Sequence, residues 1–448
     1  MAKVEIARGT AETLVSADGI PLIREAEHDL QPTNVDRNVL RLSLTKYGDI
    51  YPGKAIVTLT IAVEVAGMDV ATPLTPPPWT KLLRACAMAQ SGQAATIFAY
   101  RVVGAPVSDL GPLRHGEQLL GSALSGVTNN DSTSYGDGFS HDGGINTTVF
   151  VKEGTGGVGT GSGTLVGAVS GTIFNINQRS TNKPIGYAPQ SDVNLQASET
   201  IELYKDGKAL KAKGCVGNVE FQFNHGDAVV ARFTMQGVVQ FPSTTGPPIK
   251  GYVDIAIPTD SFEGHKVPPT FLGSRLSLAS PINAPAGYNS VGPVQGNRYG
   301  TGGTAGFTTL GSLNQVTLET GNTLVLQPNS LDPDGVNFGF ITDRAPQGKF
   351  NPTEVLNIEY DFMSRFVAGS PARMHILVGA TNHADVTTAD LNTFEFLTPG
   401  VTMNQLGDAD RDGVNIWDAS FKIGGGDYDS SPTGELPGND NEFIIVHR

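Results

Sequence analysis

The sequence predicts a mainly β protein made of two tandem β modules of the sandwich or barrel type, each with one short helix. Apolar and polar residues alternate with a period of two in several segments, which is the pattern of half-buried antiparallel strands. A similar order of strands, helix and strands occurs before and after a proline-rich junction at 267–269. In addition, 55 of the 448 residues are glycine, well above an average usage of roughly 7%, and they gather in loops.

The first module begins with the clearest strand, at residues 56–65. Its odd positions from 57 to 65 are apolar, whereas Thr58, Thr60 and Glu64 are polar. This pattern predicts a strand with one buried and one wet face. The run 39–45 alternates in the same way through three leucines. We therefore expect a hairpin of these two strands, with residues 47–53 as a long tip.

A helix is expected after three prolines at 76–78. Trp79, Leu82, Leu83 and Cys86 have the spacing of one helix face, and proline suits the first helical turn. The predicted helix spans 79–89, covers one side of the sheet and buries Cys86. The only other cysteine is Cys215, and two cysteines are too few for a disulfide framework.

Residues 108–191 are rich in Gly, Ser, Thr and Asn and are too long for a simple connection. We interpret them as an insertion with strands of its own near 148–151 and 172–176. The glycine run 156–163 lacks the Gly-Lys-Ser/Thr ending of a phosphate-binding loop, so a flexible loop is the favoured interpretation.

The first module resumes after the insertion with two hairpins. Asp206 and Gly207 separate two alternating runs within 201–210, which is a strong signal for a two-residue hairpin turn. The runs 219–223 and 231–235 flank a polar turn. The first module thus comprises residues 1–107 and 192–266.

The second module is predicted to span 267–448. Strands are expected around 316–318, 337–342, 374–378 and 393–397, with a helix at 361–368. The final apolar run 443–446 predicts a last strand that holds the C-terminal end in a sheet.

Composition and motifs argue against several classes of function. The net charge of −14 argues against a surface that wraps nucleic acid, which needs clustered Lys and Arg. The start of the chain has no signal-peptide pattern and no run of about 18 apolar residues occurs, so we expect a soluble protein with no membrane partner. No nucleophile, acid–base pair or cofactor motif stands out. We therefore expect no enzyme and no cofactor.

One acidic segment resembles the start of a calcium loop. Asp408, Asp410 and Asp412 precede Gly413, but the twelfth position of such a loop is Ala419 and not a carboxylate. An acidic, solvated β turn is the favoured interpretation, and a metal site is the weaker alternative.

Several segments together resemble the tail tube proteins, or major tail proteins, of long-tailed bacteriophages. They include a tryptophan-led helix and a closing hairpin of the first module, and they cover most of the chain outside the insertion. The segments are 38–41, 47–56, 78–86, 217–221, 233–237, 337–344, 361–362, 365–366 and 407–418. The chain is far longer than a single tube module, and the insertion at 108–191 is extra.

The resemblance implies a structural virion protein of the phage tail that is assembled in the host bacterial cytoplasm. Two tube modules in one chain imply a homotrimeric ring with pseudo-sixfold symmetry, because three chains would supply six modules. A hexamer is the alternative. Stacked rings would form the tube through which DNA passes without specific binding during genome ejection. A tape measure protein and a tail terminator are the expected partners.

If the chain forms a tube, the polar positions of its alternating strands are candidates for the lumen. They are Thr58, Thr60, Glu64, Glu220, Gln222, Gln315, Thr317 and Glu319. Loops that protrude along the axis are candidates for contacts between rings. These contact candidates belong to the tips 47–53 and 328–335 and are Tyr47, Asp49, Tyr51, Pro328, Asp332 and Asp334.

The rival interpretation is a surface-exposed β-rich adhesin or carbohydrate-binding module, which would share the glycine-rich, acidic, strand-dominated composition. Such a protein is expected to show an export signal and exposed aromatic residues, and this chain has two tryptophans. A polysaccharide depolymerase would show repeated strand coils and clustered carboxylates, and neither pattern occurs here.

Overall fold

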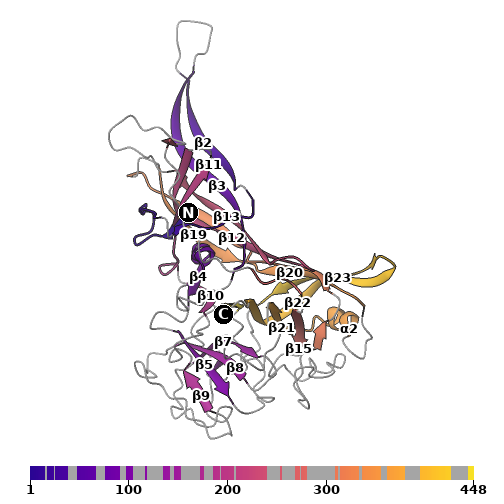
Figure 1. The fold of residues 1–448 in the computed structure, drawn as a ribbon. Coiled ribbons are helices and arrows are strands. Elements are labelled where there is room, and N and C mark those ends of the chain that lie inside the picture. Colours follow the sequence, from indigo (N-terminus) through magenta and orange to yellow (C-terminus); the bar gives the residue numbers. More distant parts are fainter. Residues whose placement is uncertain are drawn as a thin grey trace.

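The protein is mainly β, and most of its strands join one long antiparallel sheet (Figure 1). The computed structural model describes residues 1–15, 18–24, 26–38, 48–66, 76–90, 97–103, 117–118, 135–141, 146–152, 172–175, 185–191, 193–205, 208–239, 253–254, 268–272, 274–279, 308–310, 313–331, 335–354, 361–378, 394–424 and 442–447.

Eight consecutive neighbours form the main run of this sheet, and each is antiparallel to the next. In spatial order they are β2 (Glu27–Asn38), β3 (Gly48–Glu64), β13 (Val230–Val239), β12 (Lys208–Asn224), β17 (Leu313–Glu319), β20 (Gln347–Pro352), β23 (Val414–Ile423) and β22 (Phe394–Arg411). The first four strands come from the predicted first module and the last four from the second. The two predicted modules therefore meet where β12 pairs with β17.

The remaining strands of this sheet extend it at three places. The first half of β22 pairs with β21 (Ala372–Val378) and β24 (Ile444–His447), and its second half pairs with β23. β15 (Arg275–Ala279) and β16 (Thr308–Leu310) continue from β21, whereas β10 (Ile185–Pro189) and β4 (Met88–Gln90) continue from β24. β11 (Glu199–Lys205) and β14 (Val253–Asp254) pair with β12, and β1 (Ala2–Val4) pairs with β11.

Two further sheets are separate. β18 (Asn322–Pro328) and β19 (Val336–Arg344) form a two-stranded sheet. A five-stranded sheet has the order β6 (Glu117–Gln118), β7 (Tyr135–His141), β8 (Asn146–Lys152), β5 (Ile97–Val103) and β9 (Thr172–Asn175). β8 and β9 confirm the strands predicted near 148–151 and 172–176. The glycine run 156–163 lies outside the described residues.

The first helix is shorter than the predicted 79–89. It consists of η2 (Pro78–Thr80) and α1 (Lys81–Ala85), and the left-handed φ of 53° at Ala87 turns the chain into β4. The predicted apolar face is confirmed, because Trp79, Leu82, Leu83 and Cys86 are all buried. The Trp79 ring nitrogen also donates a hydrogen bond to the carbonyl of Ala66 at 3.0 Å.

The predicted second helix is confirmed as α2 (Phe362–Val367). Asp361 caps it, since its carboxylate accepts a hydrogen bond from the Ser364 amide at 2.9 Å. The predicted strands at 316–318, 337–342 and 374–378 lie within β17, β19 and β21. The final strand is also confirmed, because β24 pairs with both β10 and β22.

The first predicted hairpin needs a correction. The strand paired with β3 is β2, at 27–38, and the predicted strand 39–45 lies outside the described residues. Residues 48–53 are not a tip, since they belong to β3 and pair with β2 from Gly48 to Pro52. Figure 1 shows the resulting β2–β3 hairpin extending beyond the body as an arm. Backbone pairing continues along the arm as far as Asn38 and Gly48.

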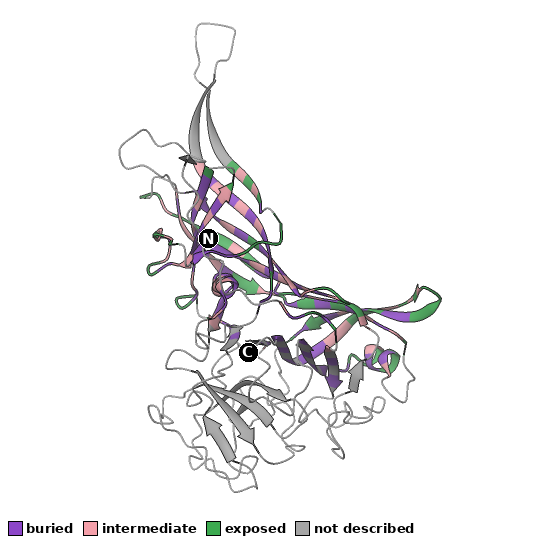
Figure 2. Cartoon of the chain, viewed as in Figure 1, coloured by how far each residue is buried: buried purple, intermediate pink, exposed green. Residues whose placement is uncertain are grey.

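The core lies on one side of the main sheet, and buried and exposed positions alternate along its strands (Figure 2). Phe221 and Phe223 of β12 pack on Phe394 of β22, with ring centroids 5.2 and 5.7 Å apart. Further along, Phe350 of β20 lies 6.1 Å from Phe362 of α2. Aromatic contacts thus join strands on both sides of the β12–β17 junction.

We expect Phe221→Ala to lower the free energy of unfolding by about 3–5 kcal/mol, because it removes a buried ring and leaves a cavity. Phe221 is only 1% exposed. Urea unfolding followed by tryptophan fluorescence measures the change. The neighbouring Gln222→Ala, on the opposite side of the same strand, is the control, and an equal loss in both variants would contradict this description of the core.

Candidate functional site

The strand positions predicted to face a lumen lie together on one side of the main sheet. Thr58, Thr60 and Glu64 of β3 pair with residues 236, 234 and 230 of β13. On β12 and β17 the pairs are Glu220 with Glu319, Gln222 with Thr317, and Asn224 with Gln315. Directly paired residues of antiparallel strands point to the same side of a sheet, and β12 also pairs with β13. All of the lumen candidates therefore share one side.

The same register adds polar side chains from neighbouring strands, and none of them is buried. We call these side chains, opposite the aromatic core, the polar face; Val216 and Val238 lie on the same side but are buried, and Val216 lies beside Gly339 of β19. Besides the lumen candidates it includes Glu27, Asp29 and Gln31 of β2, Arg232, Thr234 and Gln236 of β13, Asn218 and Asn224 of β12, Gln347, Lys349 and Asn351 of β20, and Asp418, Ser420 and Lys422 of β23.

The contributions of β20 and β23 were missed in the sequence. In β23 the signal was present, because Trp417, Ala419, Phe421 and Ile423 alternate with polar residues and are buried. In β20 a glycine hides the alternation. A Cβ at Gly348 would lie 2.5 Å from the Thr317 carbonyl oxygen and 2.5 Å from the Phe421 ring. Glycine is therefore needed there for β20 to fit between its neighbours.

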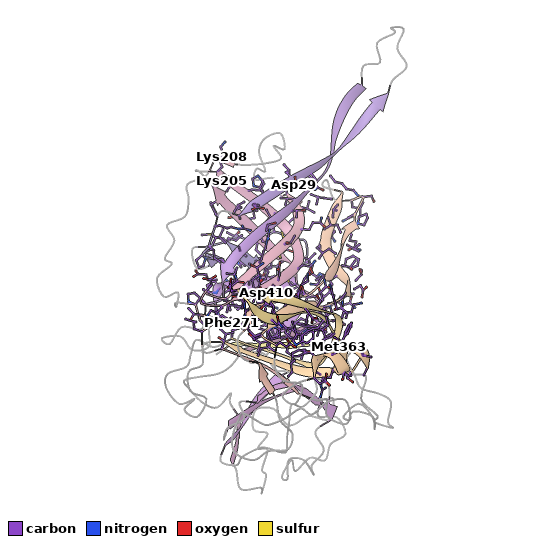
Figure 3. All side chains as sticks on the ribbon, turned by 90° about the vertical axis from the view of Figure 1, so that its right-hand side faces the viewer. Asp29, Lys205, Lys208, Phe271, Met363 and Asp410 are labelled. Carbon is purple, nitrogen blue, oxygen red and sulfur yellow. The ribbon has the colours of Figure 1, made fainter. Side chains whose placement is uncertain are left out.

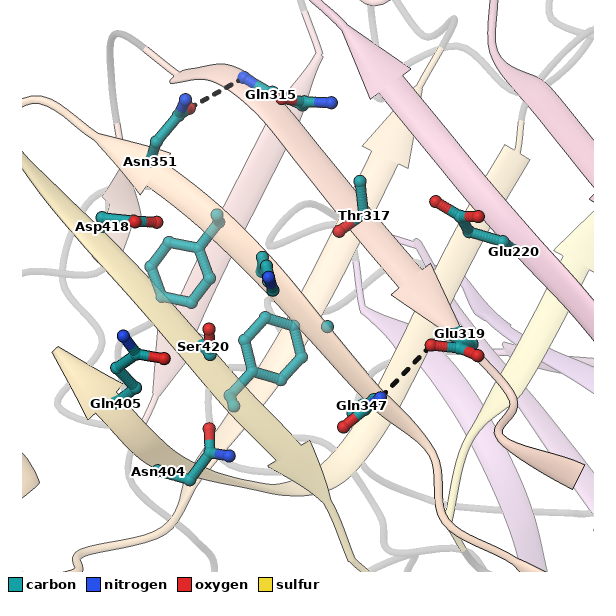
Figure 4. A pocket seen from close by; sticks show the side chains of 14 residues that line it. Glu220, Gln315, Thr317, Glu319, Gln347, Asn351, Asn404, Gln405, Asp418 and Ser420 are labelled. Carbon is teal, nitrogen blue, oxygen red and sulfur yellow. Dashed lines mark hydrogen bonds between the residues drawn. The ribbon is translucent and has the colours of Figure 1, made fainter.

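A hollow of about 660 Å³ lies over the second-module part of the polar face (Figure 4). Carboxylate and amide side chains dominate its lining, and hydrogen bonds fix two of them. Asn351 accepts from the backbone amide of Gln315 at 2.8 Å, and Gln347 donates to Glu319 at 3.2 Å. The hollow is thus a wet, hydrogen-bonding surface that spans β12, β17, β20 and β23.

Charged side chains of both signs occur on the described part of the polar face. Along the main run the acidic ones are Glu27, Asp29, Glu64, Glu220, Glu319 and Asp418, and the basic ones include Lys54, Lys211, Lys213, Arg232, Lys349 and Lys422. Glu220 of β12 is paired with Arg232 of β13 on one side and with Glu319 of β17 on the other. The like-charged pair lies at the junction of the predicted modules, so this part of the wall repels anions.

Three of the contact candidates are described, and they lie on two hairpins. Asp49 and Tyr51 belong to the β2–β3 arm, where they pair with Arg37 and Val35. Pro328 ends β18, and the loop to β19 contains Leu331, which is 91% exposed. Tyr47, Asp332 and Asp334 lie outside the described residues.

Asp408 and Asp410 end β22, and Asp412 with Gly413 forms the two-residue turn to β23. Both turn residues have positive φ, 53° and 81°, as this kind of hairpin turn requires. The Gly413 amide donates to Asp410 at 3.1 Å. This geometry is that of an acidic β turn. No group of three or more potential metal ligands occurs among the described residues. In Figure 3, Asp410 lies below Asp29 of β2 in the view.

Within the described parts of the chain, no helix has both the length and the apolar character needed to cross a membrane. The chain matches no protein-family model, and no curated protein is detectably similar to it. The role of the polar face therefore has to be inferred from its geometry and chemistry.

We expect Glu319→Gln to raise the free energy of unfolding by about 0.2–1 kcal/mol at low salt, because it relieves the repulsion from Glu220 across the strands. The gain should shrink in 0.5 M NaCl by roughly the screening expected for exposed charges. Urea unfolding at both salt concentrations measures it. Glu354→Gln, an exposed carboxylate off the polar face, is the control. A salt-independent loss of stability would contradict the assignment.

Proposed function

We propose that this chain is a structural virion protein that polymerises into stacked rings and forms the tail tube of a long-tailed phage. The observation that carries the proposal is the polar face, where all of the lumen candidates, the paired Glu220 and Glu319 among them, lie on one side of a continuous sheet. The other side is the aromatic core. A sheet of this kind suits a tube wall, because it has a wet side for the channel and a packed side for rigidity.

Edge pairing between copies is the proposed means of ring closure. Among the described strands, β2 pairs only with β3, so its outer edge offers unpaired backbone groups to a neighbouring chain. Closing a sheet on itself removes such edges, which otherwise promote aggregation. The tandem arrangement of the two predicted modules in one sheet favours a homotrimer with pseudo-sixfold symmetry, and a hexamer is the alternative.

The surface chemistry of the polar face supports a conduit for DNA. Phosphate groups are repelled by the paired carboxylates of Glu220 and Glu319 and by the exposed Glu64, so DNA would pass this part of the wall without specific binding. In this proposal the chain has no catalytic role and no cofactor, its place is the tail of the virion after assembly in the host cytoplasm, and a tape measure protein and tail terminator are its partners.

The alternative is an adhesin or carbohydrate-binding module that uses the hollow on the polar face. Sugar-binding surfaces rely on accessible aromatic rings. The aromatic residues at this hollow are Phe350 and Phe421, and both are buried in the core. The hollow therefore fits a solvated channel wall better than a sugar-binding site.

Charge reversal on the polar face tests the lumen assignment. Tubes of the Glu64→Lys, Glu220→Lys variant should retain short duplex DNA and protect it from nuclease, because lysines in the channel would bind phosphate. Wild-type tubes should retain none. The control is Asp343→Lys with Glu354→Lys, two exposed carboxylates that belong to no strand of the polar face. Protection by the control alone, or by neither variant, would contradict the lumen assignment.

Shortening the arm tests its role in stacking. Residues 35–51 can be replaced by Asn-Gly, because Asn34 and Pro52 are paired across the hairpin and Asn-Gly suits a two-residue turn. We expect single rings without tubes in electron micrographs, since the shortened arm cannot reach the next ring. Tubes of normal length would reject the arm as the ring-to-ring contact. The same replacement of 329–335 tests the second candidate loop.

A further inference from the structure

A carboxyl group is buried beneath the N-terminal segment of the chain, away from the polar face. Glu199 is the first residue of β11 and is 0% exposed. It is paired with Val4 of β1 on one side and with Cys215 of β12 on the other. The carboxyl group of Glu199 is therefore enclosed where the N-terminal strand joins the main sheet.

Neither carboxyl oxygen of Glu199 has a hydrogen-bond partner among the described residues. The carboxylate of Glu5, by contrast, is fully hydrogen-bonded. It accepts from the amides of Gly9 and Gly214 at 2.7 and 2.8 Å, and from the hydroxyls of Ser198 and Thr200 at 2.5 and 2.9 Å. Four donors fill the acceptor positions of a carboxylate, and Glu199 has no such set.

Charged and titratable groups from each neighbouring element act on Glu199. Lys81 and Arg84 of α1 and the amino-terminal ammonium group favour its ionised form, whereas Glu5 opposes it. Lys81 is already paired with Asp18 at 2.8 Å. The thiols Cys86 and Cys215 also lie within its field. No neighbouring cation is thus placed to compensate a buried charge on Glu199 by direct contact.

Burial is the largest influence on Glu199 and raises its pKa to about 8, against an ordinary value of 4.5. Burial likewise raises the pKa of both cysteine thiols. On β10, close to Arg84, burial raises the pKa of Tyr187. At neutral pH the enclosed groups around Glu199 are therefore mostly uncharged.

The element that pairs over Glu199 is a three-residue edge strand, which the Glu5 carboxylate also holds to Ser198, Thr200 and Gly214. β1 pairs with β11 through only three residues. Around it, the Glu5 amide bonds to Ser198 at 3.0 Å, and Met1 exchanges backbone hydrogen bonds with Glu202. Short edge strands open with less free energy than a central strand, and opening would let water reach the carboxyl group.

From this arrangement we infer that Glu199 makes the docking of residues 1–15 depend on a proton. The segment is held when the Glu199 carboxyl is neutral and loosens when that carboxyl ionises. The inference concerns a conformational switch and does not depend on tube assembly.

The direction of the pH dependence follows from the folded and open forms. The docked form binds the Glu199 proton more tightly than the open form does. The resulting stabilisation of the docked form is complete below about pH 4.5 and is lost as pH rises through about 8. Between these values the opening constant should rise by up to about tenfold per pH unit, and it should level off above pH 8.

Hydrogen exchange tests the switch on the full chain. Exchange of peptides covering residues 1–10, corrected for intrinsic rates, is measured from pH 6 to 9 in the wild type, in Glu199→Gln and in Glu354→Gln. Wild type and Glu354→Gln should show the full rise with pH, and Glu199→Gln should show a smaller rise, because its amide does not titrate. A rise of equal slope in Glu199→Gln would overturn the inference.

If Glu199→Gln does not fold, the pH dependence of exchange in the wild type is by itself a test. A corrected exchange rate that is constant from pH 6 to 9 would overturn the switch without any variant. Tube formation is scored separately, so a failed switch leaves the tail tube proposal intact, and failure to form tubes leaves the switch intact.

Discussion

The pairing of β12 with β17 is the constraint on which the rest of the structure depends. It joins the two halves of the chain and places Phe221 opposite Leu318 on the core side, and Glu220 opposite Glu319 on the other. A shift of one residue would exchange these sides. Groups beyond the strand end hold the register: Thr320 bonds through its backbone amide and its hydroxyl to the backbone of Val219, and Asn322 donates to the Gly217 carbonyl at 2.9 Å.

The fixed register separates two environments that treat acidic side chains differently. On the polar face water surrounds the carboxylates, and neighbouring amides such as Gln347 and Gln222 bond to them. A buried carboxylate needs a full set of hydrogen-bond donors, as Glu5 has. Without such donors the carboxyl group retains its proton, as at Glu199. A wet polar wall and a proton-sensitive N-terminal segment are therefore two results of the same division between water and core.

Local patterns in the sequence predict the parts of this structure that depend on near neighbours. Alternation predicts the core side of β3 and β12, the spacing of Trp79, Leu82 and Leu83 predicts the buried helix face, and Asp412-Gly413 suits a turn. Other parts depend on distant partners. The need for glycine at position 348 is evident only in the structure, where Thr317 and Phe421 lie close to it. The position of β2 likewise depends on its backbone pairing with β3. Alternation likewise gives each strand a polar side, but only the register of β12 with β17 shows that the lumen candidates form one surface.

Electron microscopy of the purified full-length chain, with rotational averaging of end-on views, tests the tail tube proposal most directly. The proposal predicts hollow rings of three chains with pseudo-sixfold symmetry that stack into tubes, and rings of six chains would replace the trimer by the hexamer. A chain that stays monomeric at every concentration and salt condition, and that is not extended from a purified tail-tip initiator, would contradict the proposal and favour the binding-module alternative.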